Sequence, residues 1–60
     1  MTTTTQADAT ADATVRLTRL VREVEHNLGR RMPDGTVQAF AAVLGADASI
    51  VLALLGREAP

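Results

Sequence analysis

The segment from Asp47 to Gly56 constrains the fold more than any other, because it is a short helix-like stretch with apolar residues on nearly every side. Projected at about 100° per residue, its large apolar side chains point in most directions around the axis. A helix of this kind requires protein on more than one face, and a chain of 60 residues has little protein to supply. We therefore predict that this segment divides its apolar surface between the core of the chain and a partner chain, with the partner interface drawn from Ile50, Val51, Leu52, Leu54 and Leu55.

Length and composition also point to association. Sixty residues make one domain, close to the size at which a single hydrophobic core is only marginally sufficient. Small domains usually add disulfides, a metal ion or a partner subunit. The chain has no cysteine, so it cannot form disulfides. With a single histidine besides, a structural zinc site is not expected. We expect a homodimer, or a helical protein as partner.

The charge balance offers no general attraction to nucleic acid or to acidic lipid, because the formal net charge is −1. The chain opens without a charged stretch followed by an apolar run, so no secretory signal is expected. Its apolar runs are far shorter than the roughly 20 residues that cross a bilayer. We expect a cytoplasmic protein with neither a membrane partner nor a small-molecule substrate.

Residues 1–14 are rich in Thr, Ala and Asp and contain no large apolar residue after Met1. Such a segment buries too little surface to offset the entropy lost on ordering, so we predict a disordered tail. The alternative is that its alanines extend the first helix backward to about residue 8. The rest of the chain, residues 15–60, is predicted to be one all-α module. Thr14 or Asp12 is the expected N-cap of its first helix.

Turn and cap residues divide the module into three short helices, at about 15–29, 35–44 and 47–55, and no sheet is expected. Pro33 disfavours helix at the preceding residue. Asp47 is the expected N-cap of the third helix. Three glycines are expected to end the helices, and these are Gly29, Gly45 and Gly56.

The first helix has an apolar face and a basic face. Its apolar residues fall within an arc of about 100° and are expected to pack against Phe40, Val43 and Leu44 of the second helix. These residues are Leu17, Leu20, Val21, Val24 and Leu28.

A basic ridge, consisting of Arg19, Arg22, His26 and Arg30, lies opposite the apolar face within about 80°. A functional interpretation is a surface that contacts phosphate or an acidic partner. The simpler interpretation is a solvated outer face, with Glu23 beside it. The chain lacks Tyr and Trp, and its one Phe belongs to an apolar face, so binding of single-stranded nucleic acid is disfavoured.

No residue pattern predicts catalysis, a cofactor or a metal site. Glu23 and His26 have the Glu-x-x-His spacing of metal ligands in helical bundles, but such sites need further inward-facing Glu residues and these two face outward. Ser49 is the only serine and has no positioned base. We therefore expect a protein that is not an enzyme.

Residues 24–56 resemble the C-terminal half of Cro/XRE-type helix-turn-helix repressors, through a Glu, a Gly, a Pro and an apolar helix that ends in Leu-Gly. The matching residues are Glu25, Gly29, Pro33, Leu44 and Gly45. The resemblance implies a DNA-binding regulator in which Arg19 and Arg22 fall roughly where base-reading residues sit. The chain departs from the pattern because Leu28 looks like an insertion and the helix that braces the reader is absent.

The sequence therefore predicts a small, non-catalytic helical docking or oligomerisation module with an accessory or regulatory role. The alternative is a small DNA-binding transcriptional regulator related to the Cro/XRE repressors.

Overall fold

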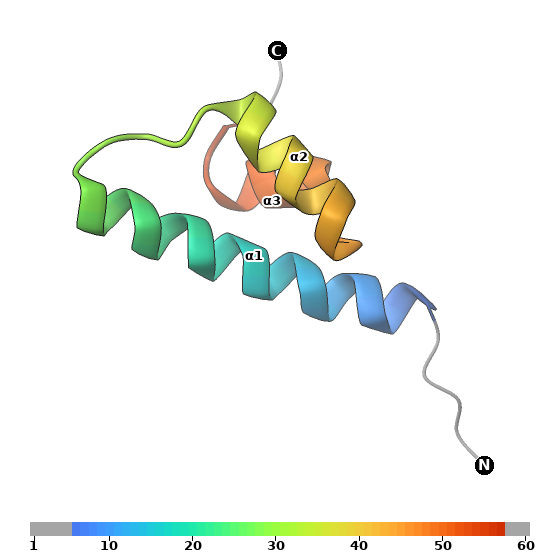
Figure 1. Cartoon of the computed structure of the whole chain (residues 1–60). Helices are drawn as coiled ribbons and strands as arrows, with labels where there is room; N and C mark the ends of the chain where they lie inside the picture. The colour runs from blue at the N-terminus through green and yellow to red at the C-terminus, as the bar shows by residue number, and fades with distance from the viewer. Residues whose placement is uncertain (1–5, 58–60) are drawn as a thin grey trace.

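The computed structural model describes residues 6–57, and it describes side chains from residue 8 onward. This part of the chain forms three helices and no strand, as predicted (Figure 1). Helix α1 spans Gln6–Leu28, α2 spans Asp34–Leu44 and α3 spans Ala48–Leu54. The fold is all-α.

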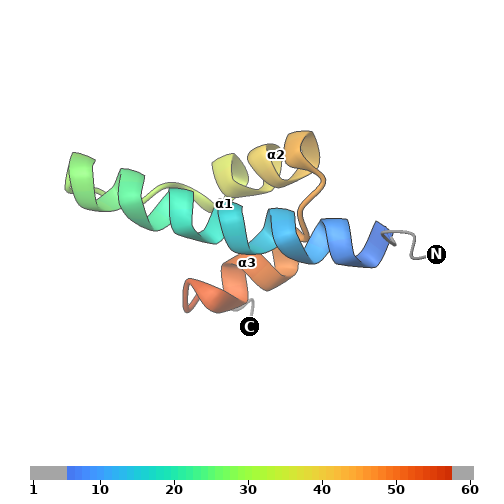
Figure 2. The same ribbon diagram turned by 90° about the horizontal axis from the view of Figure 1, so that it is seen from below.

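The two short helices flank the long one, so that α1 is the common support (Figures 1 and 2). The amide of Met32, just before α2, donates to Glu25 near the end of α1. The amide of Asp47, just before α3, donates to Thr14 nearer the start of α1. Helix α2 therefore runs antiparallel to α1, and α3 runs parallel to it.

Helix α1 begins at Gln6 and not near residue 15, which corrects the predicted boundary. Of the tail predicted over residues 1–14, residues 1–5 lie outside the described residues and the remainder is helical. Alternate alanines in this stretch favour helix, since alanine has the highest helix propensity. Tertiary structure adds to this preference, because Thr14 is buried against the start of α3.

We expected Thr14 or Asp12 to be the N-cap of α1, but both residues lie in the interior of the helix. The Thr14 hydroxyl donates to the Thr10 carbonyl at 2.6 Å and accepts the Asp47 amide at 2.9 Å. The Thr18 hydroxyl, also buried, donates to the Thr14 carbonyl at 2.8 Å. Two polar side chains on the buried side of α1 are therefore fully bonded, and one of them positions α3.

The ends of the helices follow the predicted chemistry. Gly29, Gly45 and Gly56 have φ angles of 65°, 73° and 78°, the left-handed region in which glycine ends helices at little cost. The Asp47 carboxylate accepts the amides of Ser49 and Ile50 at 3.0 and 3.3 Å, which confirms it as the N-cap of α3.

The core has fewer residues than predicted, and it includes Val51, which we had placed at the partner interface. Its buried apolar residues are Leu17, Val21, Val37, Ala41 and Val51. Leu20 and Leu28 of the predicted apolar face are exposed, as are Phe40, Val43 and Leu44. The cause is geometric: α2 packs on α1 and α3 through the side that carries Val37 and Ala41, so its bulkier residues stay outside the core.

No helix within residues 6–57 combines the length and the apolar character needed to cross a bilayer. Helix α1 has the length, but charged side chains occur throughout it.

Candidate docking surfaces

The apolar surface predicted on α3 is only partly available. Val51 is 0% exposed and belongs to the core, so its assignment to a partner interface is wrong. Leu52 and Leu55 are half-buried and pack against the core. Ile50 and Leu54 remain about half exposed. The folded chain covers more of α3 than predicted because α1 and α2 both contact it.

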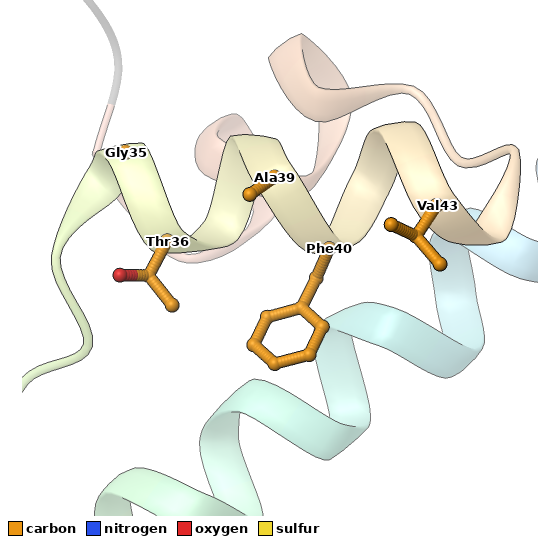
Figure 3. A pocket seen from close by; sticks show the side chains of 5 residues that line it. All are labelled: Gly35, Thr36, Ala39, Phe40 and Val43. Atoms are coloured by element: carbon orange, nitrogen blue, oxygen red, sulfur yellow. The ribbon is translucent and has the colours of Figure 1, made fainter.

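The most exposed apolar surface lies on α2. Val43 is 81% exposed and Phe40 is 42% exposed. Together with Gly35, Thr36 and Ala39 they line a shallow hollow of about 380 Å³ (Figure 3). We call this surface the α2 face. Phe40 points from it toward α1.

The α2 face is uncharged, because residues 35–46 contain no acidic or basic side chain. Beside it runs one flank of α1, where Arg16, Leu20 and Glu23 lie within about 60° of one another. Thr14, Arg22 and Glu25 lie on the opposite flank and bond to the α3 segment or its neighbours. Leu20, 45% exposed, therefore borders the α2 face.

Two hydrogen bonds, one before and one after α2, fix the position of this helix on α1. Met32 bonds to Glu25 and Asp47 bonds to Thr14, so α2 lies alongside the stretch of α1 between Thr14 and Glu25. Arg16, Leu20 and Glu23 all belong to this stretch.

The predicted basic ridge divides in the structure. Arg19, Arg22 and His26 follow Val15 at spacings of four, three and four, and this stripe covers about 60° of α1. Arg22 donates to the Leu54 carbonyl at 2.7 Å, which places the stripe beside the C-terminal end of α3.

Arg30 does not belong to the stripe, because α1 ends at Leu28. It lines a separate small hollow of about 130 Å³ with Val24 and Leu28. Those two residues face away from the stripe, since they lie near the direction of Leu17 around α1.

A cluster that the sequence analysis missed joins the end of α3 to the α1–α2 connection. Arg57, whose side chain is only 7% exposed, forms ion pairs with Glu25 and with Asp34, the latter at 3.3 Å. It also donates to the Met32 carbonyl at 2.6 Å. In the sequence, Glu25 only matched a family pattern and Arg57 follows the last predicted helix, so no spacing rule linked these two residues, which are 32 positions apart.

The Glu25 carboxylate also accepts the Met32 amide at 2.7 Å. This hydrogen bond, with help from the Arg57 guanidinium and against the opposing effect of burial, holds the pKa of Glu25 below its ordinary value. The cluster fixes the position of the C-terminal segment and is fully paired within itself, so it presents no reactive group.

Among the described residues, no three carboxylate or imidazole side chains gather closely enough to hold a metal ion. Glu23 and His26 are both exposed on α1, and Ser49 is exposed in the first turn of α3. The surfaces on which a function can be built are therefore the α2 face and the basic stripe.

No family model matches the chain, and neither a curated protein nor a solved structure is significantly similar to it. The resemblance of residues 24–56 to Cro/XRE repressors stays a prediction.

Proposed function

We propose that this protein is a non-catalytic interaction module that forms a homodimer through the α2 face. The observation that carries the proposal is the exposure of Val43 and Phe40 around an uncharged hollow. Exposed apolar surface that is contiguous and rimmed by polar residues is typical of protein interaction sites.

A second copy of the chain fits this surface because the face complements itself. In a two-fold dimer the same patch contributes from both protomers. With the axis perpendicular to α2, the two copies of this helix run antiparallel. Gly35 and Ala39 have little or no side chain and allow the two copies of α2 to approach closely. Phe40 and Val43 then pack on either side of the contact.

The charges bordering the face also fit this arrangement. Arg16 and Glu23 carry opposite charges on the flank of α1 beside the α2 face, about two turns apart. In an antiparallel two-fold contact, Arg16 of one protomer can pair with Glu23 of the other, and this pair occurs twice. Among the described residues of one protomer, Arg16 forms an ion pair only with Asp12, at 3.0 Å and largely exposed to solvent.

The interface is small, so the dimer is expected to be weak. The exposed fractions of Phe40 and Val43 add up to slightly more than one fully exposed side chain per protomer. Leu20 adds the equivalent of almost half a side chain. At about 1.5–3 kcal/mol per fully buried side chain, two protomers gain about 5–10 kcal/mol before the cost of association. We expect a Kd of about 0.1–1 mM.

Sedimentation equilibrium between about 20 µM and 2 mM tests the proposal, a range chosen to bracket that Kd. The wild type should pass from monomer to dimer. Val43→Asp should remain monomeric across the range, because an aspartate would be desolvated in the contact. Gln38→Asp is the matched control: it adds the same charge to α2, about 140° around the helix from Val43, and should dimerise as the wild type does.

Either of two results would refute the proposal. A wild type that stays monomeric at 2 mM shows that the α2 face does not bind a second copy. A dimer that Val43→Asp leaves intact shows that the contact lies elsewhere. Circular dichroism of each variant at low concentration establishes that the helices are retained.

A further inference from the structure

The surface of α1 that faces away from α2 combines positive charge with exposed apolar side chains. The stripe of Val15, Arg19, Arg22 and His26 runs along α1 toward its C-terminal end. Val15 is about half exposed. Arg19 and Arg22 have no carboxylate within ion-pair distance among residues 8–57.

Helix α3 extends this surface with apolar residues. Because α3 runs parallel to α1, its flank that carries Ile50 and Leu54 turns toward the stripe, while Val51 and Leu55 face the core. The bond from Arg22 to the Leu54 carbonyl holds one arginine at the junction of the two helices. A shallow apolar strip, formed by Val15, Ile50 and Leu54, is thereby bordered by Arg19 and Arg22.

We infer that this surface, the basic α1–α3 face, binds an acidic amphipathic segment of another protein. Carboxylates of the segment pair with Arg19 and Arg22, and its apolar side chains cover Ile50 and Leu54. Such a segment matches both properties of the face. The phosphates of a nucleic acid would satisfy the arginines, but they would leave the apolar strip exposed to water.

The distribution of charge along α1 limits where the segment lies. The part of α1 before Val15 carries Asp8 and Asp12 and no basic side chain, so it supplies no cation to which an acidic segment could bind. The contact is therefore confined to the part of α1 from Val15 to His26, beside α3. This face is separate from the α2 face, so a dimer would present two copies of it.

Fluorescence anisotropy with a labelled 16-residue peptide tests the inference. The probe carries leucine on one helical face and glutamate on the other, and a second version has glutamine in place of every glutamate. The wild type should bind the glutamate peptide, and the glutamine version should bind at least about 5-fold more weakly.

Three variants of the full chain locate the contact. Arg19→Glu and Ile50→Asp should each weaken binding of the glutamate peptide at least about 5-fold, the first through charge and the second through the apolar strip. Arg30→Glu, which makes the same change of net charge on the connection after α1, should alter the Kd less than about 2-fold. Val43→Asp should abolish dimerisation and leave peptide binding unchanged, which separates this inference from the proposed dimer.

A 20-base-pair DNA duplex is titrated in parallel at about 150 mM salt. Tighter binding of the duplex than of the peptide, lost in Arg19→Glu, would overturn the inference in favour of a DNA-binding face. Equal weakening by Arg19→Glu and Arg30→Glu would also overturn it, since net charge alone would then explain the affinity. Absence of any binding to the peptide would do the same.

Discussion

Three leucines of α1 that share one apolar pattern in the sequence should differ sharply in their contribution to stability. Leu17 is 1% exposed, Leu20 is 45% exposed and Leu28 is 66% exposed. Leu17→Ala removes a side chain that the other two helices enclose, at a cost of about 2–5 kcal/mol including the cavity. Leu20→Ala removes a half-solvated side chain and leaves no cavity, at about 1 kcal/mol.

These magnitudes matter because so small a domain has little stability to lose. At about 0.05–0.15 kcal/mol per residue, 60 residues give a free energy of unfolding of about 3–9 kcal/mol. Leu17→Ala should therefore leave the chain marginally folded or unfolded at 25 °C. Leu28→Ala should lie within about 0.5 kcal/mol of the wild type.

Urea unfolding followed by circular dichroism at 222 nm, at about 10 µM protein, measures all three variants on the monomer. The expected order of destabilisation is Leu17, then Leu20, then Leu28. Equal losses at Leu17 and Leu20 would refute the assignment of the core, because they would mean that α2 covers both side chains to the same extent.

Three further predictions concern the polar contacts that hold the helices together. Thr14→Val keeps the shape of the side chain but leaves the Asp47 amide without its acceptor. It should lower the free energy of unfolding in urea by about 1–3 kcal/mol, and Thr14→Ser, which keeps the hydroxyl, should recover most of this loss. Asp47→Ala removes the cap of α3 and should cost about 0.5–2 kcal/mol by the same assay, with Asp47→Asn close to the wild type; an Ala variant as stable as Asn would contradict the capping role. The pKa of Glu25 is lower in the folded chain than in the unfolded chain, so the unfolded state binds more protons. The contribution of Glu25 to stability is therefore complete above its ordinary pKa of 4.5 and is lost as the pH falls through the pKa of the folded state. Glu25→Gln should therefore show a smaller drop in thermal midpoint between pH 6 and pH 3 than the wild type, and an identical drop would show that the Glu25 carboxylate is not linked to folding.

The sequence predicted the elements of this fold better than their packing. Glycine and capping rules are local, and they placed the ends of the helices at Gly29, Gly45 and Gly56 and the start of α3 at Asp47. The start of α1 was missed because its Ala-rich beginning has helix propensity but no large apolar residue, and Thr14 is held there by a contact 33 residues away.

The candidate surfaces were only partly predictable, for a related reason. Periodicity shows which residues share a face but not which neighbour covers that face. Val51 and Val43 both occur in apolar helices. Val51 is enclosed by α1 and α2, whereas Val43 lies on the side of α2 that faces away from the core and is exposed. The Arg57–Glu25 ion pair joins distant parts of the chain, so no local pattern could indicate it.

Cysteine cross-linking within the α2 face tests the central proposal most directly, because the native chain contains no cysteine. Ala39→Cys places one thiol near the two-fold axis, where two helices in close contact bring the Cα atoms within the roughly 4.4–6.8 Å that a disulfide spans. Gln38→Cys places it on the same helix about 100° away. At about 0.5 mM protein, inside the expected range of the Kd, in a glutathione redox buffer, Ala39→Cys should form a disulfide-linked dimer at least about 10-fold more than Gln38→Cys, and adding Val43→Asp should remove this excess. Equal cross-linking at the two positions, or an excess that persists with Val43→Asp, would contradict association through the α2 face.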